Sequence, residues 1–304
     1  MESILIKRNV KLFFKDKGMF FTSLITPAIL LILYATFLGN VYRDSLTSQL
    51  PENFKLSEDI INGLVSGQLI SSLLAVSCIT VAFCSNFLIV QDKASGTIKD
   101  FNISPVKPWT LSLSYYVATL ISTLIICIVA LILGFIYMAV VGWYLSFADV
   151  CLMFLDVMLL VLFGTALSSL INFFLTSQGQ ISAVGTIISA GYGFICGAYM
   201  PISSFGETLQ KVVSFLPGTY GTSVLRNHAM RGVFNEMSTQ GMPDEVINGL
   251  KNSLDCNLYF FDNKVEILVM YLILGITVVL LVGAYVFLNA MTRYNKQNSN
   301  NRNR

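Results

Sequence analysis

Charged side chains are scarce in this sequence. Only 12% of its 304 residues are Asp, Glu, Lys or Arg, which is about half the share found in typical soluble proteins. Most of the remainder is apolar, with 55% hydrophobic residues and a mean hydropathy of +0.70. This composition argues against a soluble globular domain and predicts a protein embedded in a membrane.

Groups suited to metal, redox or hydrolytic chemistry are also few. The sequence has one histidine, His228, and its six cysteines include no CxxC pair, so we predict neither a metal site nor a disulfide framework. The phosphate-binding pattern GxxxxGK[ST] does not occur. We expect no catalytic residue, no bound metal and no cofactor in this chain. His228 with Asp255 or Glu207 would be the acid–base candidate, but a structural or solvated histidine is the better interpretation.

Long apolar segments dominate the sequence. A helix needs roughly 20 mainly apolar residues to cross a bilayer. Six segments are that long, at about 20–39, 63–90, 110–141, 150–175, 181–199 and 265–288. Helices are predicted rather than barrel strands, because apolar residues are continuous instead of alternating with polar ones. The predicted fold class is an all-α integral membrane protein with six transmembrane helices.

Positive charge gathers in the N-terminal arm, in residues 91–109 and in the tail, whereas 142–149 carries no basic residue. The positive-inside rule therefore predicts that both termini and the 91–109 segment are cytoplasmic. We expect residues 1–19 to form an amphipathic helix in the cytoplasmic interface, because its basic residues share one side. The Asn-rich tail, 295–304, is predicted to be disordered.

Polar residues recur every three or four positions along the second apolar segment. Polar groups in a membrane normally face protein or a cavity, so this stripe is predicted to face either a neighbouring helix or a route for cargo. The candidate pathway residues are Gln68, Ser72, Ile79, Phe83 and Asn86. The fifth segment instead repeats small residues that allow close helix packing, namely Gly185, Ser189, Gly193 and Gly197.

The stretch 200–264 contains apolar pieces that are too short to cross a bilayer. Ser204 and Glu207 fit a capping box for a short helix that would end at Pro217. A second helix is predicted from Thr219 to Arg231 and a third from Pro243. Short apolar helices are tolerated at membrane depth only against protein. We therefore predict outer re-entrant helices that either thicken the rim or form an outer gate at Met200, Pro201, Ile202, Leu216 and Pro217.

Two segments together resemble the membrane subunit of an ABC-2 type transporter. The first runs from Gln91 to Pro108 and contains Asp92, Lys93, Gly96, Thr97 and Pro105. Glutamine stands at position 91, where the family often has glutamate. The second begins with Gly197-Ala198-Tyr199-Met200-Pro201, passes through Leu216-Pro217-Gly218-Thr219-Tyr220 and ends with Leu225-Arg226.

The resemblance implies a single transmembrane domain over residues 1–304, paired with a second copy of itself or a homologous permease. A separate cytoplasmic ABC ATPase would bind ATP and Mg. Residues 91–109 would be a coupling loop that docks on this ATPase through Asp92, Lys93, Gly96, Thr97, Lys99 and Asp100.

The same resemblance implies export of an amphipathic, lipid-like, drug-like or lipid-linked cargo across a bacterial cytoplasmic membrane. Membrane lipids are expected partners and nucleic acid is not. A secondary transporter or channel is the alternative, although it would favour charged pathway residues or inverted repeats. Asp156 is the one acidic residue well inside an apolar segment, and it is predicted either to serve helix packing or to contact cargo.

Overall fold

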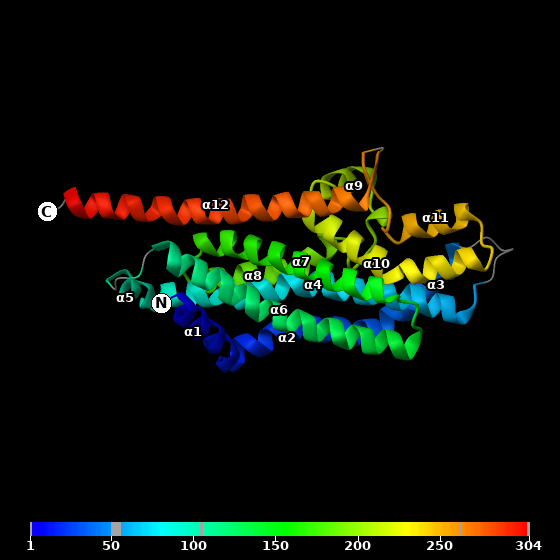
Figure 1. Ribbon diagram of the computed structural model, residues 1–304, viewed down its shortest axis with the longest axis horizontal. Coiled ribbons are helices and arrows are strands. Elements are labelled where there is room, and N and C mark those ends of the chain that lie inside the picture. Colours follow the sequence, from blue (N-terminus) through cyan, green and yellow to red (C-terminus); the bar gives the residue numbers. More distant parts are fainter. Residues whose placement is uncertain (1, 50–55, 104–105, 107, 262, 303–304) are drawn as a thin grey trace.

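The computed structural model describes residues 2–49, 56–103, 106, 108–261 and 263–302. The elements form an elongated helical bundle (Figure 1). In chain order they are α1 (Glu2–Lys15), α2 (Lys17–Leu33), the π-helical turn η1 (Tyr34–Leu38), α3 (Gly39–Gln49), α4 (Glu58–Ala94), α5 (Thr97–Ile103), α6 (Pro108–Val141), α7 (Phe147–Phe174), α8 (Gln178–Ile195), the 3₁₀ turn η2 (Ile202–Ser204), α9 (Glu207–Val213), α10 (Pro217–Thr239), α11 (Asp244–Ser253), β1 (Leu258–Phe260), β2 (Asn263–Val265) and α12 (Ile267–Arg302).

Helix α4 lies at the centre of this bundle. It contacts α2, α6, α7, α8 and α10, and 94% of its most apolar stretch is buried. No charged residue occurs between Asp59 and Asp92, so the helix can be enclosed without burying an unpaired charge. Small residues bring its neighbours close. A side chain at Gly67 would lie 2.6 Å from Met230 of α10, which means that the two backbones approach closely there.

Five helical stretches among the described residues are long and apolar enough to cross a membrane: Lys17–Asp44, Glu58–Ala94, Trp109–Val141, Phe147–Phe174 and Ile267–Met291. They correspond to five of the six predicted spans and confirm the all-α membrane class. The remaining segment, 181–199, is present as α8 but is not among the five. Helix α8 begins with two glutamines, Gln178 and Gln180, and these and its repeated glycines lower its hydropathy, so length and composition alone do not identify it.

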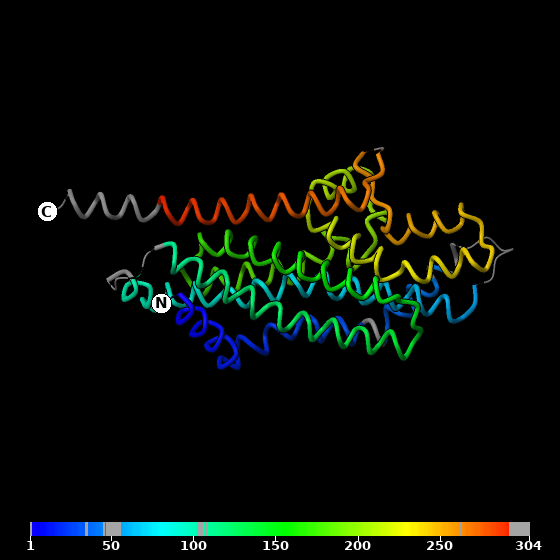
Figure 2. The backbone as a smooth tube through the Cα atoms, in the orientation of Figure 1, coloured from blue at the N-terminus to red at the C-terminus, as the bar shows by residue number. Residues whose placement is uncertain are grey.

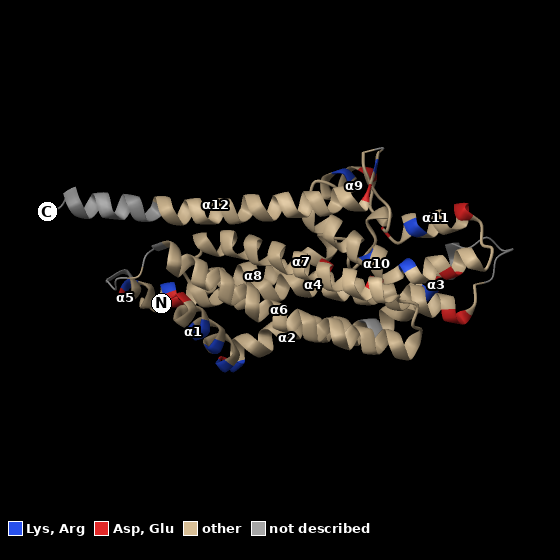
Figure 3. Ribbon diagram, in the orientation of Figure 1, with Lys and Arg blue, Asp and Glu red and all other residues tan. Residues whose placement is uncertain are grey.

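Charged residues gather at the two ends of the bundle and around α9 and the β-hairpin (Figure 3). Helices α1 and α5 lie at one end, and α3, α11 and the C-terminal part of α10 lie at the other (Figure 1). Helix α1 buries Leu5, Asn9 and Phe13 and contacts α6. Lys7, Lys11 and Lys15 are exposed on the other side, which matches the predicted amphipathic pattern, whereas Arg8 is only partly exposed.

Helix α12 extends from the β-hairpin toward the end that holds α1 and α5 (Figure 2). It continues to Arg302, through the tail that the sequence predicts to be disordered from Asn295. The physical reason for this difference is that no glycine or proline follows Gly283, so no residue breaks the helix.

The segment 200–264 corrects two sequence predictions. The N-cap of α9 is Gly206, and no side chain caps it. Ser204 instead ends the preceding 3₁₀ turn, two residues before the N-cap, so the predicted capping box does not form. Pro217 begins α10 rather than ending a helix, since the first helical position needs no backbone N–H. Helix α10 then continues to Thr239. The third helix, α11, follows Pro243 as predicted.

Candidate functional site

An apolar groove runs along the bundle between α2 and α8. Its volume is about 1190 Å³, and α4 contributes Cys84, Phe87 and Gln91 to its floor. The groove extends from Asp16 and Gln91, near the α1 end, to Val41 and Tyr199 near the α3 end. The side walls are Thr22, Ile25, Thr26, Ile29, Leu33 and Phe37 on one side and Ile181, Gly185, Ser189, Ala190 and Phe194 on the other.

The walls of this groove are largely exposed. Only 19% of the most apolar stretch that contains α2 is buried. Ile25 and Ile29 are each 51% exposed, and Phe194 is 53% exposed. In a membrane, such a surface must meet either lipid or another protein. The groove is therefore the described surface best suited to receive an apolar partner or cargo.

The small residues of α8 serve partly as packing sites within the chain. A side chain at Gly185 would lie 3.2 Å from the Phe87 ring, and the space beside Gly193 is occupied by Tyr199. Gly197 lies beyond the helix with a φ of 74°, a left-handed conformation that glycine adopts without strain. The predicted close helix packing is thus observed at Gly185, against Phe87 of α4, whereas Gly193 accommodates Tyr199 from the turn after α8.

The predicted pathway residues do not line this groove. Gln68, Ser72, Ile79, Phe83 and Asn86 are all buried inside the bundle. Asn86 donates to Ser168 Oγ at 3.1 Å and to Ser169 Oγ at 2.9 Å, and both partners belong to α7. Of the two alternatives that the polar stripe left open, contact between helices is the one seen here. Their role in transport remains a prediction.

Asp92 joins three helices at the α1 end. Arg8 of α1 donates to Asp92 Oδ2 at 3.0 Å, and the Tyr115 hydroxyl of α6 donates to the same oxygen. Asp92 is only 8% exposed. The sequence predicted a charge presented to an ATPase, whereas the structure shows a carboxylate already paired inside the chain.

Lys93 also has intramolecular partners. Its ammonium donates to the carbonyls of Asn172 at 3.0 Å, Phe173 at 2.8 Å and Leu175 at 3.2 Å. These carbonyls close the C-terminal end of α7, where a cation is favoured by the helix dipole. Asp92 and Lys93 therefore fix the end of α4 against α1, α6 and α7.

The turn that follows presents the rest of the predicted docking residues. Gly96 has a φ of 83°, which reverses the chain between α4 and α5 with little strain. Thr97 begins α5, and Lys99 and Asp100 are exposed. Whether these four residues contact an ATPase stays a prediction. Pro105 and Lys107 lie outside the described residues.

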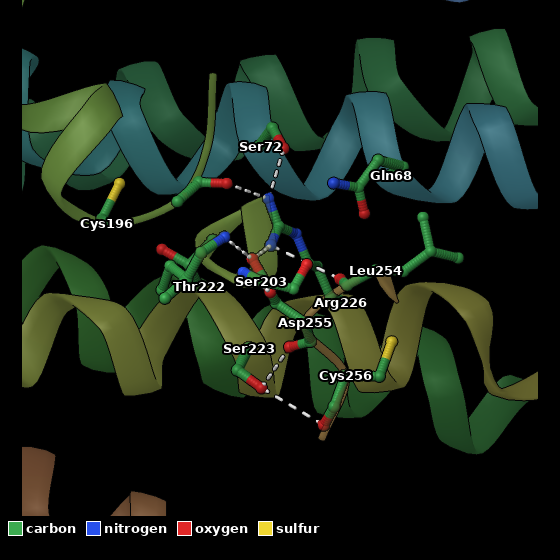
Figure 4. A network of polar contacts seen from close by, with 12 residues as sticks. Gln68, Ser72, Cys196, Ser203, Thr222, Ser223, Arg226, Leu254, Asp255 and Cys256 are labelled. Atoms are coloured by element: carbon green, nitrogen blue, oxygen red, sulfur yellow. Dashed lines mark hydrogen bonds and ion pairs between the residues drawn. The ribbon is translucent and has the colours of Figure 1, made fainter. Parts of the chain in front are cut away.

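A buried ion pair joins several elements near the opposite end (Figure 4). Arg226 of α10 is fully buried and lies 2.9 Å from the Asp255 carboxylate. It also donates to Ser72 Oγ of α4 at 3.2 Å and to the Gly197 carbonyl. The network therefore connects α10 to α4, to the end of α8 and to the segment after α11.

The carboxylate of Asp255 has further donors. The backbone N–H of Ile202 lies 2.7 Å from it and that of Ser203 lies 3.1 Å from it. Burial raises the pKa of the Asp255 carboxyl, and the Arg226 charge and both backbone donors act in the opposite direction. This ionic centre holds the 3₁₀ turn at Ile202, one of the predicted gate residues. The other predicted gate residues lie at the two ends of the 200–217 segment, and gating itself stays untested.

A second buried cluster joins α7, α10 and α12. His228 Nδ1 lies 2.6 Å from Asp156 Oδ2, and the Tyr271 hydroxyl donates to the other oxygen of Asp156. The His228 and Tyr271 rings stack with centroids 6.3 Å apart. His228 is thus a buried structural residue, the interpretation that the sequence favoured, and its acidic partner is Asp156 rather than Asp255, which pairs with Arg226. Asp156 serves helix packing, one of its two predicted roles.

Comparison with known proteins assigns the family. The family model described as ABC-2 type transporter matches residues 3–229, a range that includes α1, the α4–α5 turn, both groove walls and most of α10. No curated protein matches the chain significantly. The match covers well over half of the sequence and agrees with the five apolar helices. The chain therefore belongs to the ABC-2 type transporter family and is a multi-pass membrane permease.

Proposed function

We propose that this chain is the permease subunit of an ATP-driven exporter in a bacterial cytoplasmic membrane. In this proposal the groove between α2 and α8 forms one wall of the cargo route, and a second permease forms the other wall. The observation that carries the proposal is the groove itself. It reaches from Asp16 to Tyr199 and has a predominantly apolar lining.

A second copy of the chain, or a homologous permease, would account for the exposed walls of the groove. A single chain leaves α2 largely uncovered, whereas α4 is enclosed. Two grooves facing each other would bury both sets of walls and enclose a route between them. The lining contains few charges, with Asp16 at one end. That chemistry favours an amphipathic, lipid-like, drug-like or lipid-linked cargo over a small ion.

Helix α8 is proposed as the sixth span, and the start of α10 as a re-entrant helix. A side chain at Gly221, in the second turn of α10, would contact Leu160 of α7 and lie 3.4 Å from Leu274 of α12. Leu274 lies two turns inside α12, counted from Ile267. The beginning of α10 is therefore level with apolar spanning helices, while its C-terminal part runs toward the charged end that holds α11 (Figure 1).

The α4–α5 turn is proposed as the ATPase-docking site, with both chain termini in the cytoplasm. ATP and Mg would be held by the partner ATPase, and the chemistry of hydrolysis would belong to that subunit. The contacts of Asp92 with Arg8 and Tyr115 would carry a displacement of the turn to α1 and α6, because a buried charged hydrogen bond resists separation. Arg8 and Tyr115 would thus take part in coupling through Asp92, without contacting the ATPase themselves.

Reconstituted vesicles would test the ATP-driven mechanism against the secondary transporter or channel alternative. We expect cargo movement to require the partner ATPase and to stop when its phosphate-binding lysine is replaced. Asp100→Arg reverses an exposed charge of α5 and should reduce recovery of the ATPase with the permease. Asp244→Arg, at the start of the short helix α11 at the opposite end, should leave it unchanged. Transport that continues without ATP would contradict the proposal.

A further inference from the structure

A separate cavity of about 440 Å³ lies among α9, the start of α10, the end of α11 and the β-hairpin. A volume of this size is within the usual range for small-ligand sites, roughly 300–1000 Å³. The residues that line it include Glu207, Lys211, Asn257, Tyr259 and Phe261. It is distinct from the groove, because the two cavities share no lining residue.

One side of this cavity carries two opposite charges. Glu207 and Lys211 are four residues apart on α9, so both lie on the same helix face, and both line the cavity. Within the described ranges neither forms an ion pair with another residue. Asn252 stands across the cavity, where its Oδ1 accepts from Asn257 at 2.8 Å and from the Tyr259 hydroxyl at 3.3 Å. The cavity thus offers one free cation, one free anion and a neutral polar wall.

Phe261 lines the cavity and belongs to an exposed aromatic cluster at its rim. The rings of Phe215, Phe260 and Phe261 contact one another, with centroids 5.2, 6.2 and 5.0 Å apart. Phe215 is 63% exposed and Phe261 is 51% exposed. Such a cluster is costly in water and favourable at the boundary of a bilayer, where aromatic side chains are enriched.

The position of the hairpin places the cavity at that boundary. Strand β2 ends at Val265, and the apolar span of α12 begins at Ile267. Because the apolar span begins directly after the hairpin, the cavity and the aromatic residues beside it lie near the boundary of the bilayer. This step uses the membrane placement of α12 and does not depend on transport or on the ATPase.

We propose that this cavity binds the head group of a zwitterionic phospholipid. Lys211 would bind the phosphate and Glu207 would bind the ammonium group. Phe215, Phe260 and Phe261 would pack against the proximal acyl chains. The pair of opposite charges selects a head group that carries both signs, such as phosphatidylethanolamine, over an anionic one, such as phosphatidylglycerol.

Native mass spectrometry of the purified full chain in detergent would test this inference with dioleoyl phosphatidylethanolamine and dioleoyl phosphatidylglycerol as probes. We expect the wild-type chain to retain phosphatidylethanolamine preferentially. Lys211→Gln should weaken that binding roughly tenfold, the effect of losing one hydrogen bond to a charged group. Glu207→Gln should abolish the preference between the two lipids. Lys251→Gln is the matched control, because Lys251 contacts the Phe234 ring and does not line the cavity.

Soluble glycerophosphoethanolamine separates a membrane lipid from a free phosphorylated amine. It carries the same head group without acyl chains, so it should bind far more weakly than the lipid, and Phe261→Ser should weaken only lipid binding. Equal binding of the soluble compound would overturn the lipid assignment. Unchanged lipid retention in both charge variants, with wild-type circular dichroism, would overturn the site. ATPase recovery is not measured in this experiment, so its outcome is independent of the proposed function.

Discussion

Replacing Asp255 by Asn should destabilise the end of the bundle that holds α11, because it leaves Arg226 buried without a counter-charge. The side chains of the pair are 1% and 4% exposed. Asparagine is the appropriate substitution, since residue 255 has a φ of 54° and asparagine tolerates this left-handed conformation better than alanine. Arg226→Met is the reciprocal change, and methionine keeps the length and the helix preference of the side chain.

The size of the effect follows from burial. Breaking a buried ion pair by removing one partner costs about 3–5 kcal/mol, and Asp255→Asn should fall in that range. Arg226→Met should cost about 3 kcal/mol, because two backbone donors still stabilise the carboxylate. The double variant leaves neither charge unpaired. It should be about 2–3 kcal/mol more stable than the sum of the single effects predicts.

Equilibrium unfolding in mixed micelles with increasing dodecyl sulfate would measure the four free energies of the double-mutant cycle. Glu58→Gln provides a control, because Glu58 forms an ion pair with Arg43 at the surface and its side chain is 76% exposed. This substitution should change the free energy of unfolding by less than about 1 kcal/mol. Strict additivity of the two single effects would refute the reasoning. A single-variant cost as small as that of the control would refute it as well.

Three further variants test the packing and the turn, each by the same unfolding measurement. Gly232→Ala should lower the free energy of unfolding by about 3 kcal/mol, since a Cβ there would overlap the Tyr144 carbonyl. Its control, Gly249→Ala, places a Cβ in open space and should be neutral or stabilising. Equal effects of the two substitutions would contradict this packing. Gly96→Ala should cost about 1 kcal/mol, because its φ is 83°, and Gly96→Asn should cost less; the reverse order would contradict the turn geometry. Asp156→Asn should cost about 2 kcal/mol through its bonds with His228 and Tyr271, and an unchanged midpoint would exclude a structural role.

The sequence predicted the spanning helices well because crossing a bilayer imposes a length and a continuous apolar composition. Five of the six predicted segments meet both conditions in the structure. The α8 segment does not, since close packing requires small residues that contribute little hydropathy. The amphipathic N-terminal helix was predicted for a similar local reason, a charge pattern that repeats with the helical period.

The internal ion pairs were missed because their partners are far apart in sequence. Arg226 and Asp255 are 29 residues apart, and Asp156 and His228 are 72 apart. An arginine inside the otherwise uncharged start of α10 was a usable signal, because a buried cation requires a partner. The identity of that partner depends on which loop folds over α10, and no local pattern specifies it.

The predicted roles of Asp92 and of the polar stripe show the same limit. Helical spacing established that Gln68 and Asn86 share a face, but it could not tell which neighbour covers that face. The structure encloses α4 on nearly all sides, so its polar residues meet α7 and α10. Asp92 was read as a contact for another protein because it lies in a charged segment, whereas Arg8 and Tyr115 come from distant helices to pair with it.

Disulfide crosslinking between copies tests the central claim, that the groove faces a second permease, most directly. Single cysteines would be introduced into a cysteine-free variant. Thr26→Cys in α2 and Ser189→Cys in α8 replace residues that line the groove, whereas Ile79→Cys replaces a residue that is enclosed within the chain. Leu280→Cys replaces a leucine of α12 that is 66% exposed and lies outside the groove. We predict covalent dimers from one or both groove positions and none from Ile79 or Leu280. Dimers formed through Leu280, with none through either groove position, would contradict the proposed route.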